Sequence, residues 1–108
     1  MLFDHIALET SDIQSSVNWY LSILDSPNLI YQDETWALVE SDGTKIAFVL
    51  PQNHQAHIAF KVNSSKQEDE LKILYPDMNW KMHRDGSAYF YVHDPAGNIV
   101  EFVKYEQT

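Results

Sequence analysis

The sequence of 108 residues is long enough for one compact domain with a substantial core, and its hydrophobic fraction of 44% is ordinary for a globular protein. Sixteen acidic and seven basic residues give a formal net charge of −9, which makes nucleic acids and anionic membranes poor partners. The absence of cysteine excludes disulfides and thiolate ligands, and no apolar run approaches the roughly 20 residues of a membrane span. The N-terminus lacks the pattern of a secretory signal, so we expect a cytoplasmic protein.

The first half of the chain predicts one helix among four strands. Residues 2–9 are rich in apolar side chains and predict a strand, and Ser11 with Gln14 forms a capping box that predicts a helix start. Apolar residues then recur at helical spacing until Pro27. Three short strands are expected after it, with Ser41-Asp42-Gly43 as a hairpin turn, over residues 29–33, 35–40 and 44–50.

The second half predicts the same order of elements. A strand is expected over residues 55–62, and a helix over 65–75 is ended by Pro76. Three strands follow, near residues 80–84, 87–93 and 98–105. Both halves therefore predict the order βαβββ.

An internal repeat supports this division. His5-Ile6-Ala7-Leu8 recurs 52 residues later as His57-Ile58-Ala59-Phe60, and Gly43 and Gly97 each begin the last strand of a half. Self-similarity at such a spacing indicates a duplicated unit. We therefore predict a single α+β domain built from two modules, residues 1–52 and 53–108. A structural duplication without a shared site is the alternative.

The repeated histidines are the first candidate site residues. A lone strand histidine is more often a core or surface residue than a ligand, but His5 and His57 occupy equivalent positions of the two modules. If the modules pack with pseudo-twofold symmetry, both imidazoles point to the same place. The pair therefore predicts a metal site.

Glu101 supplies a third candidate ligand. It interrupts an apolar run that otherwise predicts a buried strand, and a buried carboxylate is costly unless it is paired or binds a metal. Two imidazoles and one carboxylate suit a divalent ion with open positions. The alternative is an edge-strand glutamate that faces water. Ala47 occupies the equivalent position of the first module and cannot ligate, which leaves coordination positions for water and substrate.

These motifs, together with Phe90-Tyr91-Val92-His93-Asp94-Pro95-Ala96-Gly97-Asn98-Ile99-Val100-Glu101, resemble the glyoxalase / bleomycin-resistance / extradiol-dioxygenase superfamily, also called vicinal oxygen chelate proteins. The resemblance covers nearly the whole chain. It implies two βαβββ modules that curve a mixed sheet around a cavity, commonly completed in a homodimer. It also implies a divalent metal ion, for which Mn, Fe, Ni and Zn are all candidates, and a small-molecule substrate that chelates the ion through adjacent oxygens.

The resemblance leaves the branch of the superfamily open. Glyoxalase I uses four ligands, which Ala47 puts in doubt, whereas fosfomycin-modifying transferases and extradiol dioxygenases use a set like His5, His57 and Glu101. The transferases have threonine where this chain has Ala7. A metal-dependent lyase, dioxygenase or transferase is therefore expected. The alternative is a metal-free protein that binds a small molecule or drug, like the bleomycin-resistance proteins.

Six further residues are candidates for substrate chemistry. His83 and Tyr91 fall close to the positions of the active-site histidine and tyrosine of extradiol dioxygenases, and both can transfer protons. A solvated histidine and a core tyrosine are the alternatives for these two residues. Candidates for binding the substrate are the cations Lys81 and Arg84 and the aromatic residues Trp36 and Tyr89.

Overall fold

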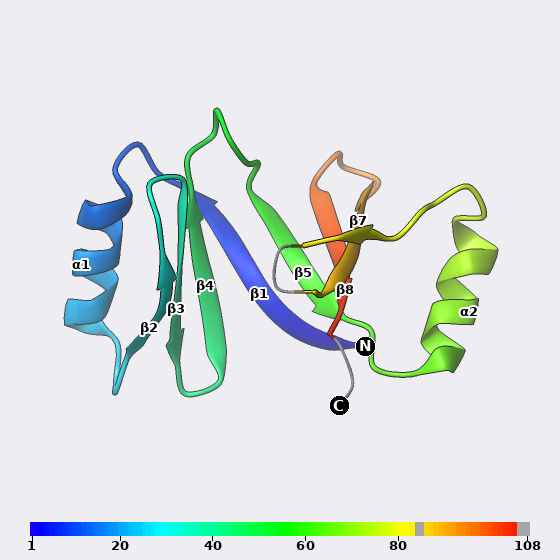
Figure 1. Ribbon diagram of the computed structural model, residues 1–108, viewed down its shortest axis with the longest axis horizontal. Coiled ribbons are helices and arrows are strands. Elements are labelled where there is room, and N and C mark those ends of the chain that lie inside the picture. Colours follow the sequence, from blue (N-terminus) through cyan, green and yellow to red (C-terminus); the bar gives the residue numbers. More distant parts are fainter. Residues whose placement is uncertain (84–85, 106–108) are drawn as a thin grey trace. The chain divides into compact units, whose positions relative to one another are not determined.

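The computed structural model describes residues 1–83 and 86–105, and these form eight strands and two helices (Figure 1). Their order is βαβββ followed by βαβββ, which confirms the predicted α+β class and the order of elements. Contacts group these residues into two compact units. The first unit is Asp4–Ile58, and the second combines Met1–Phe3 with the residues from Ala59 onward.

The first unit contains four strands and one helix. Strands β3 and β4 are joined by the predicted hairpin turn, in which Asp42 and Gly43 have φ angles of 49° and 80°. The strand order is β2-β3-β4-β1, with β1 parallel to β4 and the other pairs antiparallel. The elements are β1 (Leu2–Glu9), α1 (Ile13–Ile23), β2 (Asn28–Gln32), β3 (Trp36–Ser41) and β4 (Thr44–Val49).

The two faces of this sheet differ in what they pack against. Helix α1 packs through Ile13 and Val17 on a buried cluster with Ala37, Val39 and Phe48 (Figure 1). Since successive strand residues point to opposite faces, the other face carries the alternate positions. That face also bears His5 and Lys45, which are register partners. It holds a second apolar cluster, which consists of Ala7, Ala47, Val49, Trp36 and Leu38.

Helix α1 is capped differently from the prediction. The N-cap is Asp12, whose carboxylate accepts a hydrogen bond from the Ser15 backbone at 3.1 Å. Ser11 is therefore not the cap, and the predicted capping box is wrong. The physical reason is that the residues of the predicted box have other partners. The Gln14 side chain donates a hydrogen bond to Asn18 along the helix, and the backbone N–H of Asp12 donates one to Thr10 Oγ1.

The second unit repeats the pattern with a much shorter strand β6. It spans two residues where residues 80–84 were predicted, and residue 84 lies outside the described ranges. The strand order is β5-β8-β7-β6, and the pairs β8–β7 and β7–β6 are antiparallel. The elements are β5 (His57–Lys61), whose first two residues belong to the first unit, α2 (Ser65–Leu74), β6 (Lys81–Met82), β7 (Ala88–His93) and β8 (Ile99–Lys104).

The second unit also separates an apolar face from a polar one. Leu71 of α2 packs with Phe90 and Phe102, on one face of β7 and β8. Tyr91 and Glu101 alternate with these phenylalanines and are register partners, so they share the opposite face. Within the described ranges, neither α1 nor α2 is long and apolar enough to cross a membrane.

Candidate metal centre

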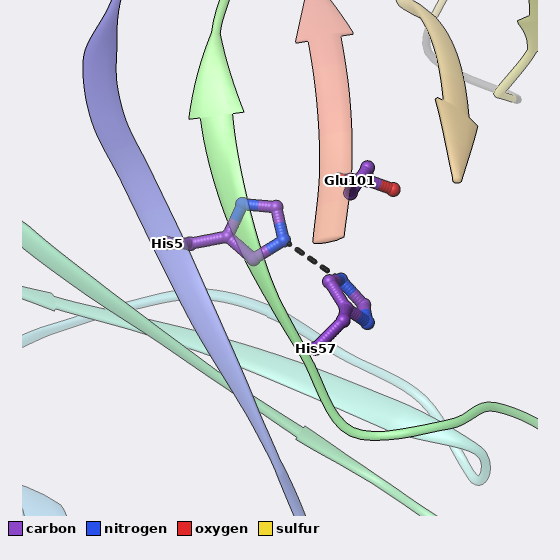
Figure 2. Close-up of side chains that lie close together, drawn as sticks. All are labelled: His5, His57 and Glu101. Carbon is purple, nitrogen blue, oxygen red and sulfur yellow. Dashed lines mark hydrogen bonds between the residues drawn. The ribbon is translucent and has the colours of Figure 1, made fainter. Parts of the chain in front are cut away.

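His5 and His57 face each other through their Nε2 atoms. His5 lies on β1 and His57 begins β5, and the two Nε2 atoms are 3.2 Å apart (Figure 2). Their rings meet edge to face, with centroids 5.3 Å apart and planes inclined by 78°. The two histidines that are equivalent in the sequence repeat therefore meet in space.

The outer nitrogen of each ring has an acceptor as its partner. His57 Nδ1 lies 2.8 Å from the Gln55 carbonyl oxygen, and His5 Nδ1 lies 2.7 Å from Asp4 Oδ2. A carbonyl and an ionised carboxylate can only accept, so each Nδ1 donates its proton. In a neutral imidazole the lone pair then lies on Nε2.

This arrangement fits a cation between the two rings. Two lone pairs that face each other at 3.2 Å repel, unless a proton or a metal ion lies between them. Two imidazole nitrogens that each bind zinc at about 2.0–2.1 Å are themselves about 3.0–3.4 Å apart. The separation between His5 and His57 therefore suits two ligands of one metal ion.

Glu101 is a buried carboxylate in the second unit. Its exposed fraction is 2%, which contradicts the alternative of an edge-strand glutamate facing water. His83 Nε2 lies 3.5 Å from Glu101 Oε2, and the Tyr91 side chain forms a hydrogen bond to the same carboxylate. Burial, together with the charge of Glu101, raises the pKa of Tyr91 well above its ordinary value of 10.0. Tyr91 therefore stays a neutral phenol whose hydroxyl can donate a hydrogen bond.

Figure 2 draws the three predicted ligands together. His5 and His57 belong to the first unit and Glu101 belongs to the second, and all three are labelled in Figure 2. Ala47, at the position equivalent to Glu101, is a buried neighbour of Ala7 and offers no ligand atom. The predicted ligands are therefore two imidazoles of the first unit and one carboxylate of the second.

The predicted substrate-binding residues lie in both units. Trp36 lies on the same sheet face as His5 and stacks on Tyr31, with ring centroids 4.3 Å apart. In the second unit Tyr89 stacks on His83 at 3.7 Å and pairs in register with the exposed Lys81. Arg84, the remaining predicted residue, lies outside the described residues.

Two charged residues near the histidine pair were not predicted from the sequence. Asp4 is buried beside His5, and Lys45 is the register partner of His5 on β4. The sequence could have indicated Asp4, because it is an acidic residue within an apolar strand, as Glu101 is. In both places this pattern predicts a buried carboxylate that needs a partner. The sequence does not indicate Lys45, because Lys45 lies beside His5 only through the pairing of β1 with β4, and these strands are distant in the sequence.

The comparisons with known proteins give structural matches only. No family model and no curated protein matches the sequence. A hypothetical protein from Bacillus halodurans C-125 has a similar structure, with a TM-score of 0.74, 18% identity and coverage of 98% of this chain and 95% of that one. A glyoxalase/bleomycin resistance protein/dioxygenase superfamily member from Vibrio splendidus 12B01 gives a TM-score of 0.68 and 16% identity, with coverage of 94% and 97%.

A larger enzyme also contains this fold. An extradiol ring-cleaving dioxygenase from Brevibacterium fuscum matches with a TM-score of 0.71 and 20% identity over 99% of this chain. The match covers 33% of the dioxygenase, so this chain spans about one third of that protein. At such identities the likeness concerns the fold. The chain adopts the vicinal-oxygen-chelate fold of the glyoxalase/bleomycin resistance/dioxygenase superfamily.

Proposed function

We propose that this protein is a divalent-metal-dependent enzyme whose ion is held by His5, His57 and Glu101. The observation that carries the proposal is the pair of Nε2 atoms 3.2 Å apart, each on a ring whose Nδ1 already has an acceptor. The burial of the Glu101 carboxylate supports its part in the proposal, because a buried carboxylate is costly unless it is paired or binds a metal. A set of two histidines and one carboxylate suits Fe²⁺, Mn²⁺, Ni²⁺ or Zn²⁺.

The proposed substrate is a small molecule with two adjacent oxygens. When bound, the ion would supply Lewis-acid stabilisation of negative charge on those oxygens. Ala47 contributes no ligand, which leaves coordination positions for the substrate. The superfamily includes lyases, dioxygenases and transferases that share this general chemistry. We propose metal-dependent chemistry of this kind and do not assign one of the three reactions.

His83 and Tyr91 are the proposed proton-transfer residues. The raised pKa keeps the Tyr91 phenol neutral, so its hydroxyl would donate a hydrogen bond, and a proton only to a strongly basic group. His83 is held by stacking on Tyr89, with its Nε2 directed to Glu101. Trp36, Tyr89, Lys81 and Arg84 remain proposals for contacts with the substrate, the two cations for an anionic group.

The proposal is tested by metal analysis and thermal unfolding. Protein purified without chelator is expected to contain close to one metal ion per chain. After chelation, addition of Mn²⁺, Fe²⁺, Ni²⁺ or Zn²⁺ should raise Tm, because a ligand that binds only the folded state stabilises it by mass action.

Glu101→Gln is the variant that tests the ligand set. It keeps the shape of the side chain but removes its charge, so the metal-dependent rise in Tm should be largely lost. Glu9→Gln is the matched control, since Glu9 is an exposed residue of β1 and its loss changes the net charge equally. A wild-type protein without metal and without a thermal shift would contradict the proposal and favour the metal-free binding protein.

A further inference from the structure

Asp4 is a buried carboxylate that the proposed ligand set leaves unexplained. It lies on β1 directly before His5, and its exposed fraction is 6%. Burial of a carboxylate costs several kcal/mol unless the charge is paired or hydrogen-bonded. Its presence in a strand of apolar residues therefore calls for a partner that gains from its charge.

Asp4 is hydrogen-bonded to the outer nitrogen of His5. The distance of 2.7 Å between Asp4 Oδ2 and His5 Nδ1 is typical of a charge-assisted hydrogen bond. A carboxylate at this position holds the proton on Nδ1, fixes the ring orientation and leaves the lone pair of the neutral ring on Nε2. That Nε2 is the atom directed at His57.

The other histidine is held by a weaker partner. His57 Nδ1 lies 2.8 Å from the backbone carbonyl oxygen of Gln55, which carries a dipole but no full charge. In both rings Nδ1 is thus the donor and Nε2 the acceptor. The partner of Nδ1 is a charged carboxylate at His5 and an uncharged carbonyl at His57. Of the two partners, only Asp4 acts through its side chain, so its contribution can be removed by substitution.

We propose that Asp4 is a positioning residue of the metal site, which sets the affinity for a divalent cation by fixing the tautomer of His5. This inference rests on the proposed function, because it assigns Asp4 a role toward the same ion. Asp4 would act through His5 and not as a ligand, because its carboxylate lies on Nδ1 and the proposed ligand atom is Nε2. Partners of this kind typically change metal affinity by about 10- to 100-fold when they are removed.

The test compares Co²⁺ binding to chelator-treated wild type, Asp4→Asn and Asp4→Ala. Co²⁺ is the probe because its visible spectrum reports ligation and its titration gives Kd. Asp4→Asn keeps a possible acceptor without the charge and should weaken Co²⁺ binding by roughly 10-fold, and Asp4→Ala should weaken it more, within roughly 100-fold. Glu9→Gln, on the same strand but exposed, should bind like wild type.

A second readout separates positioning from a merely structural role. Long-range ¹H–¹⁵N correlation spectra of the chelator-treated proteins distinguish imidazole tautomers. In wild type, Nδ1 of both His5 and His57 should be protonated. In Asp4→Ala the Nε2–H form of His5 should increase, while His57 keeps its tautomer. Asp4→Asn is nearly isosteric, so the test does not depend on the folding of the alanine variant.

The outcomes distinguish the two proposals. If wild type binds no Co²⁺, the proposed function fails. If wild type binds Co²⁺ but both variants bind it with a Kd within twofold of wild type, the role of Asp4 is overturned while the proposed function stands. A lower Tm of the variants together with an unchanged Kd also overturns that role, since it assigns Asp4 to stability alone.

Discussion

At the residue scale, Glu101 is held by neighbours on its own sheet. The hydrogen bond with Tyr91 joins two residues that are directly opposite in the β7–β8 register, and His83 approaches the same carboxylate. A buried carboxylate gains from such donors because they offset part of the lost hydration. These contacts also limit the directions in which Glu101 can present an oxygen to a ligand.

Tyr91→Phe tests this restraint. The substitution removes the hydroxyl from the carboxylate and keeps the ring, so we expect metal affinity to fall by about 10-fold, while unfolding free energy falls by about 1 kcal/mol. Calorimetric titration with Zn²⁺ and denaturant unfolding measure the two quantities. Tyr89→Phe is the control, because Tyr89 stacks on His83 through its ring, which phenylalanine retains. Equal affinities for Tyr91→Phe and wild type would contradict the restraint.

At the element scale, the turn between β2 and β3 is organised by Asp33. Its carboxylate accepts hydrogen bonds from the Thr35 backbone at 2.7 Å and the Trp36 backbone at 3.0 Å, and also from the Tyr31 hydroxyl. These donors stabilise the charged form and hold the pKa of Asp33 well below its ordinary value of 3.8. The same turn positions Tyr31 and Trp36, whose rings stack.

Asp33→Ala should therefore destabilise the protein in a pH-dependent way. Loss of these hydrogen bonds is expected to cost about 1 kcal/mol at neutral pH, as measured by urea unfolding. Because the pKa of Asp33 is lower in the folded state, its contribution is present above the ordinary value of 3.8 and is lost as the pH falls below it. The difference from wild type should shrink below that pH. Glu34→Ala, at the exposed neighbouring position, should show neither effect.

At the scale of the whole molecule, large apolar side chains remain exposed on the first unit. Trp19 and Ile23 of α1 are 57% and 54% exposed, and Leu29 and Ile30 of β2 are 44% and 50% exposed. Exposed apolar side chains mark a surface that associates where they form one contiguous patch. We propose that these side chains contribute to the homodimer that the sequence resemblance implies.

We therefore expect a mass twice the 12.6 kDa of one chain in size-exclusion chromatography with light scattering. The mass should be the same after treatment with EDTA, because both proposed histidine ligands belong to one chain and one unit. A single-chain mass at all protein concentrations would contradict the homodimer. A mass that halves on removal of metal would indicate that the ion, rather than the apolar surface, joins the copies.

The sequence by itself determined the order of the elements and the identity of the histidine pair. Strand and helix periodicities are local, so strand β1 over residues 2–9 and the turn at Asp42-Gly43 could be predicted from neighbouring residues. The repeat made His5 equivalent to His57, and the acid within an apolar run made Glu101 unusual. A duplication is visible in the sequence itself, and so is an acidic residue within an apolar run, where burial of its charge would be costly.

Only the tertiary structure decided which side chains become partners. The Nδ1 contacts of the two histidines, the pairing of Tyr91 with Glu101 and the position of Lys45 beside His5 depend on strand register and rotamers. The cap of α1 at Asp12 also followed from competing side-chain hydrogen bonds. Such choices are set by geometry between residues that are distant in sequence, or by small energy differences between neighbours, and neither leaves a periodic pattern in the chain.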